Sequence, residues 1–291
     1  MSSAAASLLP EDVVARSGSN FRAGFVCMSA ERRAAMMAIY AFCRVADDAV
    51  DDAGSRAEGA DNLAFWRNEL ECVERGDPAT AIGRGLHEAF ETFGGRAEPL
   101  RELLDGMAMD LDPVDFPDLP ALEVYCHRVA SAVGLACLPV FGVRGEEAEA
   151  FAESLGQALQ MTNIRRDLRS DADAGRVYVP CDWLRDCEVE KEWLGGNGPE
   201  EVYRADGPVA QLCERFHEVA TKRFGEAARS LRRMSWRERR RLVPARIMGA
   251  VYHDLLRRLR RRGGDLGAQS ERVPGCAKLW LASSVMLGVR A

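Results

Sequence analysis

Apolar residues recur every three or four positions along most of the chain, and no stretch alternates convincingly with period two. A spacing of three or four is typical of helices that bury one face, whereas alternation is typical of half-buried strands. The pattern therefore predicts an all-α protein. The predicted helices span residues 30–53, 61–75, 80–93, 98–111, 119–141, 146–171, 199–233, 237–262 and 276–287.

Breaks between the predicted helices are short. Glycine and proline mark several of them, and residues 174–180 are expected to be extended. No fixed-period repeat, low-complexity tract or long linker marks a boundary between domains. We therefore expect one domain that covers residues 1–291.

The composition predicts a folded cytoplasmic protein. Of the 291 residues, 47% are hydrophobic and 29% are charged, which is typical of a chain with a packed core. The net charge of −6 argues against a general nucleic-acid binder, because such a protein needs a basic face. The cysteines are scattered and no leader sequence opens the chain, so we expect reduced thiols. The uncharged run 129–143 is too short to span a bilayer and is expected to be a core helix.

The first predicted helix carries paired carboxylates along one face. Asp47 and Asp51 lie four residues apart, which places them one turn from each other on the same side of a helix. Like charges at this spacing cost an isolated helix roughly 0.2–0.5 kcal/mol per pair. Four further polar residues continue or flank this first stripe: Tyr40, Arg44, Asp48 and Asp52.

A second stripe lies on the predicted helix 146–171. Its members share one helical face and offer side-chain oxygens: Gln160, Asn163, Asp167 and Asp171. Oxygen ligands are the ones that Mg²⁺ prefers, usually together with water and substrate phosphates. If the two helices face each other, both sets of oxygens converge on one cavity, where they would repel each other without cations.

Either stripe alone is equally well explained as a solvated acidic face that pairs with nearby arginines. Two stripes of the same geometry, both accompanied by arginine, favour a binding site. Ionisation of an allylic diphosphate requires metal ions and arginines around the leaving group and an apolar pocket around the remaining cation. The pattern therefore predicts a diphosphate site with several Mg²⁺ ions beside an apolar helical pocket.

These residues resemble the squalene/phytoene synthase family of trans-prenyltransferases. The family's two aspartate motifs are matched by Arg44, Asp47, Asp48 and Asp51 and by Asn163, Asp167 and Asp171. Residues 175–180 resemble the flap that follows the second motif, and residues 125–134 the tyrosine-bearing helix. The chain departs from the family at Ser17, Ser131 and Arg165. The resemblance covers about residues 15–285 and implies an isoprenoid-synthase helical bundle around a central cavity.

Within the family, segments near both ends of the chain most resemble bacterial enzymes of hopanoid biosynthesis. The resemblance implies a transferase that condenses two farnesyl diphosphates head to head into presqualene diphosphate. One alternative is phytoene synthesis from geranylgeranyl diphosphate. Another is a non-catalytic member that acts as a binding or assembly protein, although such a member would be expected to lose stripe aspartates, and this chain keeps all of them.

The resemblance also implies roles for single residues. Metal ions would be held by Asp47, Asp51, Asn163, Asp167 and Asp171, of which Asp47, Asp51 and Asp167 would be catalytic. Arg44, Arg166 and Arg176 would bind diphosphate oxygens. Tyr125 would assist the loss of the proton that closes the cyclopropane, although a plain core tyrosine, with released diphosphate as the base, is an equal alternative. Further substrate contacts would come from Ser17, Phe21, Phe25, Tyr40, Asp48, Val133, Gln160, Tyr178 and Tyr252.

Other cofactors and partners follow less directly. We expect no NADPH, because the acidic segment 181–199 is a poor place for its phosphates and no G-x-G-x-x-G turn follows a strand. The four histidines show no ligand spacing. The arginine runs 237–241 and 257–262 are expected to be solvated, with peripheral contact to the inner face of a membrane as the alternative. A downstream pathway enzyme is another candidate partner, and the oligomeric state cannot be predicted.

Overall fold

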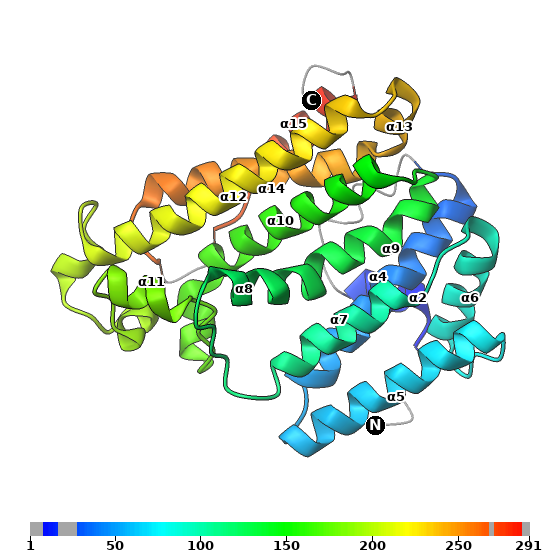
Figure 1. Cartoon of the computed structure of the whole chain (residues 1–291), viewed down its shortest axis with the longest axis horizontal. Coiled ribbons are helices and arrows are strands. Elements are labelled where there is room, and N and C mark those ends of the chain that lie inside the picture. The colour runs from blue at the N-terminus through cyan, green and yellow to red at the C-terminus, as the bar shows by residue number, and fades with distance from the viewer. Residues whose placement is uncertain (1–7, 17–27, 268–270, 287–291) are drawn as a thin grey trace.

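The computed structural model describes residues 8–16, 28–267 and 271–286 as a helical bundle without strands (Figure 1). The prediction of an all-α fold is thus confirmed. Ser17, Phe21 and Phe25 lie outside the described residues. The α-helices are α2 (Pro10–Arg16), α4 (Ala30–Asp51), α5 (Arg56–Arg75), α6 (Ala81–Phe93), α7 (Glu98–Met109), α8 (Leu119–Cys126), α9 (Ala132–Phe141), α10 (Glu146–Asp173), α11 (Cys181–Asp186), α12 (Pro208–Arg233), α13 (Trp236–Arg241), α14 (Val243–Arg262) and α15 (Gly275–Met286).

Local capping explains where several helices begin. The side chains of Ser29, Ser55 and Thr80 accept hydrogen bonds from backbone amides in the first turns of α4, α5 and α6. Asp118 caps α8 in the same way. Each cap satisfies an amide that has no partner within its own helix, so these residues fix the start of the helix.

Two long helices predicted from the periodicity are interrupted. The range 199–233 contains a 3₁₀ turn, η3 (Glu200–Tyr203), and α12 begins only at Pro208, where the missing amide of proline costs nothing. The range 237–262 is divided at Leu242 into α13 and α14. Three short elements were not predicted, because they span too few turns to show a period in their apolar residues: α2, α11 and the 3₁₀ helix η2 (Lys191–Gly195).

The helix predicted at 119–141 is present and contains a π-helical turn, η1 (His127–Ser131), between α8 and α9. By length and composition it could cross a membrane, but half of its most apolar window is buried inside the bundle. It packs against both α7 and α10. At the π turn, the Ser131 hydroxyl donates to the Glu153 carbonyl at 2.9 Å, and Gly156 of α10 lies directly against the Ser131 backbone.

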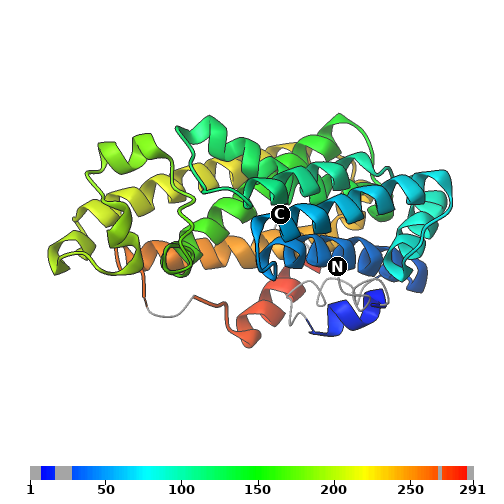
Figure 2. The ribbon, with the colours of Figure 1, turned by 90° about the horizontal axis from the view of Figure 1, so that it is seen from below.

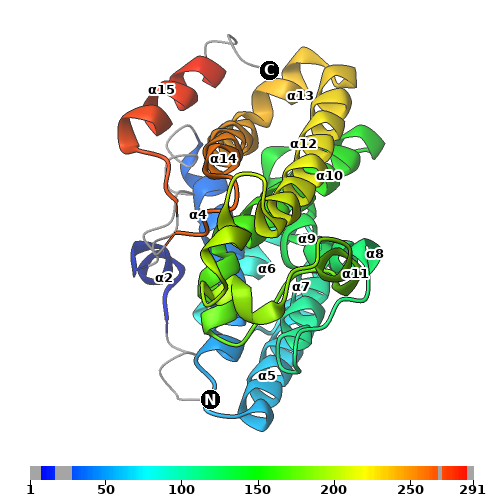
Figure 3. The same ribbon diagram turned by 90° about the vertical axis from the view of Figure 1, so that its left-hand side faces the viewer.

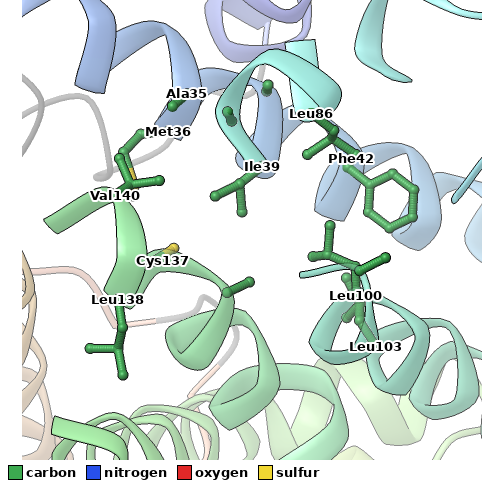
Figure 4. Packing of buried hydrophobic residues seen from close by; sticks show 14 of the residues in the cluster. Ala35, Met36, Ile39, Phe42, Leu86, Leu100, Leu103, Cys137, Leu138 and Val140 are labelled. Atoms are coloured by element: carbon green, nitrogen blue, oxygen red, sulfur yellow. The ribbon is translucent and has the colours of Figure 1, made fainter. Parts of the chain in front are cut away.

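The helices pack around two large apolar clusters. One joins α4, α6, α7 and α9, with Ile39, Phe42, Leu86 and Leu103 at its centre (Figure 4). The other lies around α8, α10, α11 and α12. The long antiparallel pair α10–α12 lies side by side in Figures 1 and 3, α14 packs against both of these helices, and α15 packs on α14. In Figure 2, α2 and α15 lie on the same outer side of the bundle.

The departure at Arg165 has a structural explanation. The side chain of Arg165 on α10 is buried, and its guanidinium donates to the Gly263 carbonyl at the end of α14, at 2.7 Å. It therefore ties two helices together through a carbonyl that the helix end leaves without a partner. The eight described cysteines are free of disulfides, and four of them are buried.

Candidate active site

The first stripe lies on the last turns of α4, where arginines from two places meet its carboxylates. The Arg44 guanidinium donates to Asp47 at 2.9 Å and also pairs with Asp48. Arg176, which follows α10, donates to Asp51 Oδ1 at 2.8 Å. This last contact joins the segment after the second stripe to the end of the first one.

The second stripe occupies the later turns of α10. Arg166 Nε donates to Asp167 Oδ1 at 2.9 Å, and Tyr252 of α14 lies beside the same guanidinium. The Asn163 amide donates to Gln160 Oε1 at 3.3 Å, which leaves Asn163 Oδ1 buried with no hydrogen-bond partner. An unpartnered buried oxygen is unusual in proteins, and this one is therefore available as a ligand to a cation.

Negative charge accumulates between the stripes. Burial, with the nearby Asp51 carboxylate, raises the pKa of Asp47 to about 6. Burial, with the neighbouring Asp167, raises the pKa of Asp171 to about 7. Asp110 contributes to both shifts, so it lies near members of both stripes. Both shifts come first from burial and then from a neighbouring carboxylate, so the two stripes hold closely spaced acidic groups that are partly withdrawn from water.

Asp110 is a site residue that the sequence analysis did not identify. It lies at the C-terminal end of α7 and accepts hydrogen bonds from Tyr125 (3.0 Å) and Tyr178 (2.7 Å). The two phenol rings stack with their centroids 5.2 Å apart. Burial raises the pKa of Asp110 despite these hydrogen bonds, and burial also raises the pKa of Tyr125. Asp110 follows a helix end and belongs to no stripe, so spacing gave no sign of it.

An apolar cavity of about 110 Å³ begins one helical turn before Asn163 on α10. Val133, a predicted pocket residue, lines it, whereas Tyr40 and Tyr252 are not among its lining residues. Its wall is almost entirely apolar and comes from α4, η1, α9, α10, α14 and the residue before α14: Met36, Ala130, Val133, Gly134, Cys137, Leu138, Phe141, Phe151, Ala152, Leu155, Gly156, Leu159, Leu242, Pro244, Ala245 and Met248.

A larger hollow of about 530 Å³ lies elsewhere, beside α7, α9 and η1. Its lining includes His127, Glu102, Glu153 and Arg144, and none of the stripe residues. Charged walls do not suit a prenyl chain, so we assign the smaller apolar cavity, and not this hollow, to the site.

The residues between the stripes suit a hard divalent cation, although they do not form a preassembled cage. Within the described ranges, no three His, Cys, Asp or Glu side chains lie close enough together to hold one metal ion. Asp47, Asp48, Asp51 and Asp167 pair with arginines instead. The unpartnered oxygen of Asn163 and the closely spaced carboxylates both fit cations that arrive together with an anionic ligand.

Comparison with known proteins agrees with this geometry. Residues 14–275 match the family model described as squalene/phytoene synthase. The chain is 35% identical over 248 residues to a presqualene diphosphate synthase of Rhodopseudomonas palustris, which covers 84% of this chain and 85% of that protein. It is 38% identical to a phytoene synthase of Thermus thermophilus, but over only 185 residues, 64% of this chain and 63% of that one.

Solved structures give the same picture. A dehydrosqualene synthase in complex with a ligand superposes with a TM-score of 0.82 at 25% identity, and the match covers 96% of this chain and 95% of that one. A squalene synthase of Alicyclobacillus acidocaldarius superposes with a TM-score of 0.75, also at 25% identity, over 87% of this chain and 92% of that one.

Proposed function

The chain belongs to the squalene/phytoene synthase family, and we propose that it is a prenyltransferase that joins two farnesyl diphosphates head to head into presqualene diphosphate. The observation that carries the reaction class is the pair of arginine-bound carboxylate stripes at one end of an apolar cavity. The choice of product rests on similarity to three bacterial presqualene diphosphate synthases, at 32–35% identity over 84–90% of this chain.

The arginines would bind the diphosphate groups. Arg44, Arg166 and Arg176 each hold a stripe carboxylate in the structure and could exchange it for diphosphate oxygens, which a guanidinium binds in the same forked geometry. Mg²⁺, held by Asp47, Asp51, Asn163, Asp167 and Asp171, would neutralise the carboxylates and the leaving diphosphate. Exchange of arginine partners would therefore couple substrate binding to metal binding.

The apolar cavity would receive the apolar end of a prenyl chain and exclude water from it. Its lining offers almost no polar surface, so a carbocation formed at the stripes would meet few nucleophiles other than the second substrate's alkene. Because the cavity extends from Leu159 on α10 to Leu242 at the start of α14, it runs away from the stripes, as a chain anchored by its diphosphate requires.

Tyr125 and Asp110 would handle the proton lost when the cyclopropane closes. The Tyr125 hydroxyl already donates to Asp110 Oδ2, so its oxygen has lone pairs available. It could accept a proton from the cation while its own proton passes to Asp110. The raised pKa of Asp110 favours this transfer, because it makes the carboxylate a better base than an exposed one.

Release of diphosphate from farnesyl diphosphate tests the proposal against a non-catalytic role. We expect release that depends on Mg²⁺ and is lost in the Asp51→Asn variant, which removes the carboxylate bound to Arg176. Asp182→Asn, outside the stripes, is the matched control and should keep full activity. Binding of farnesyl diphosphate without any release would favour an assembly protein and contradict the proposal.

A further inference from the structure

A strongly basic surface lies at the opposite end of the bundle from the aspartates. Residues 232–241 contain six arginines and one glutamate, a net charge of +5 in a chain whose total is −6. They form the end of α12 and all of α13, here called the α13 platform. In Figure 1, α13 lies at one end of the molecule, and α11, which follows the second stripe, lies at the other.

The α13 platform is held rigidly at both ends. Met234 is 6% exposed and Leu242 is fully buried, so each end of α13 is anchored in the bundle. Ser235 and Glu238 form a capping box at its start. Arg241 donates to the Gly142 carbonyl at the end of α9, at 2.7 Å. The residues between these anchors are therefore presented outward on a fixed frame.

The outward side of the α13 platform combines an exposed aromatic ring with arginines that have no partner among the described residues. Trp236 is 61% exposed, and the Arg240 guanidinium lies over its ring, 4.8 Å from the centroid. Arg232 and Arg237 are exposed and make no hydrogen bond or ion pair with any described residue. Arginines that stabilised the fold would be expected to have protein partners, as Arg233 has in Glu147 at 3.2 Å.

The platform also adjoins the apolar cavity. Leu242, Pro244 and Ala245, which follow α13 directly, line the cavity wall. Leu242 follows Arg241 of the α13 platform directly, so the far end of the apolar site and the basic surface are adjacent along the chain.

We propose that the α13 platform docks this protein onto an anionic lipid bilayer. Tryptophan prefers the boundary between head groups and acyl chains, and arginines around it are attracted to anionic head groups. The choice of a bilayer over other anions rests on the proposed function, because a product with two farnesyl chains and a diphosphate is itself an amphiphile that water does not dissolve. Docking at the cavity's far end would bring the lipid surface next to the prenyl chains.

Vesicle binding tests this proposal without substrate, so its outcome is independent of catalysis. The purified full-length protein is sedimented with vesicles of phosphatidylcholine alone or of equal parts phosphatidylcholine and phosphatidylglycerol. We expect binding to the anionic vesicles only, weakened by added salt. The double variant Arg232→Gln/Arg237→Gln should bind roughly tenfold or more weakly, given the attraction of each basic side chain to such a surface.

A matched control removes the same charge elsewhere. Arg257→Gln/Arg261→Gln on the exposed last turns of α14 should bind anionic vesicles like the unchanged protein. Trp236→Ser should weaken binding while circular dichroism and diphosphate release from farnesyl diphosphate stay unchanged. Equal losses in the two arginine pairs would show a general charge effect and overturn the proposal. Tighter binding to duplex DNA than to anionic vesicles would also overturn it, in favour of a nucleic-acid surface.

Discussion

The Asp47 carboxylate shows how electrostatic repulsion within the site prepares single residues to bind cations. Asp47 is more than half-buried near Asp51, Asp48 and Asp110, and Arg44 is the one cation among the described residues that pairs with it, so its carboxylate is held at an electrostatic cost. The same holds for Asp171, which is close to Asp167. Partly buried carboxylates that lie close to other carboxylates are suited to bind cations, because a bound cation relieves the repulsion between them.

Asp47→Asn is therefore expected to abolish turnover while the protein folds normally. Loss of a carboxylate that is crowded by like charges should leave the free energy of unfolding without Mg²⁺ unchanged or raise it. Turnover and thermal unfolding of the metal-free protein measure the two effects. Asp61→Asn on the exposed side of α5 is the control, and near-normal turnover in Asp47→Asn would remove this residue from the metal site.

The pair of Tyr125 and Asp110 gives a second prediction at this scale. Asp110→Asn should lower turnover about 10²–10⁴-fold, the usual contribution of a positioned acid or base, because an amide cannot take up the proton. Asp112→Asn changes a neighbouring exposed carboxylate whose ion pair is with Arg56 and not with a stripe residue, so activity should persist. Equal activity of the two variants would leave released diphosphate as the base.

Among the elements, the π turn η1 is held by His127. Its Nδ1 lies 2.6 Å from Glu153 of α10 and its Nε2 lies 2.9 Å from Glu102 of α7. The sequence analysis found no role for this histidine, because its two glutamate partners lie on different helices and show no regular spacing from it in the sequence. The hydrogen bond to Glu153 raises the pKa of His127, so the imidazolium links three helices.

This link predicts a pH dependence of stability. A raised pKa in the folded state means that the contribution of His127 is fully present below its unfolded pKa, about 6.5. The contribution is lost as the pH rises through the folded-state pKa. The difference in free energy of unfolding between the unchanged protein and His127→Gln, from urea titrations, should therefore shrink at alkaline pH. A difference that is constant from neutral to alkaline pH would contradict this.

Elements also show what could be predicted from the sequence. Periodicity located α4, α10 and the helix 119–141 within a few residues, because each buries a continuous face. The break at Leu242 depends on tertiary contacts, and the late start of α12 depends on one proline. The spacing of apolar residues shows neither, so the predicted helices extended across both positions. The stripes themselves were readable, whereas Asp110 was not, because only folding brings the end of α7 to Tyr125 and Tyr178.

For the molecule as a whole, the arginine-bound carboxylates imply that metal and diphosphate bind cooperatively. Mg²⁺ alone would have to displace arginines and lose water, which Mg²⁺ does reluctantly. We expect small melting shifts from Mg²⁺ alone and large ones from Mg²⁺ with a non-hydrolysable farnesyl diphosphate analogue. At a hundredfold excess over its dissociation constant, a ligand stabilises the folded state by about 2.7 kcal/mol. Equal shifts from metal alone and from the mixture would disagree with this coupling.

The identity of the product tests the central claim most directly. The protein is incubated with Mg²⁺ and saturating NADPH, with farnesyl and geranylgeranyl diphosphate supplied in separate reactions, and the products are identified by mass spectrometry. We expect presqualene diphosphate from farnesyl diphosphate, with no further conversion when NADPH is present. Squalene in quantity, or a clear preference for geranylgeranyl diphosphate that yields phytoene, would contradict the proposed function.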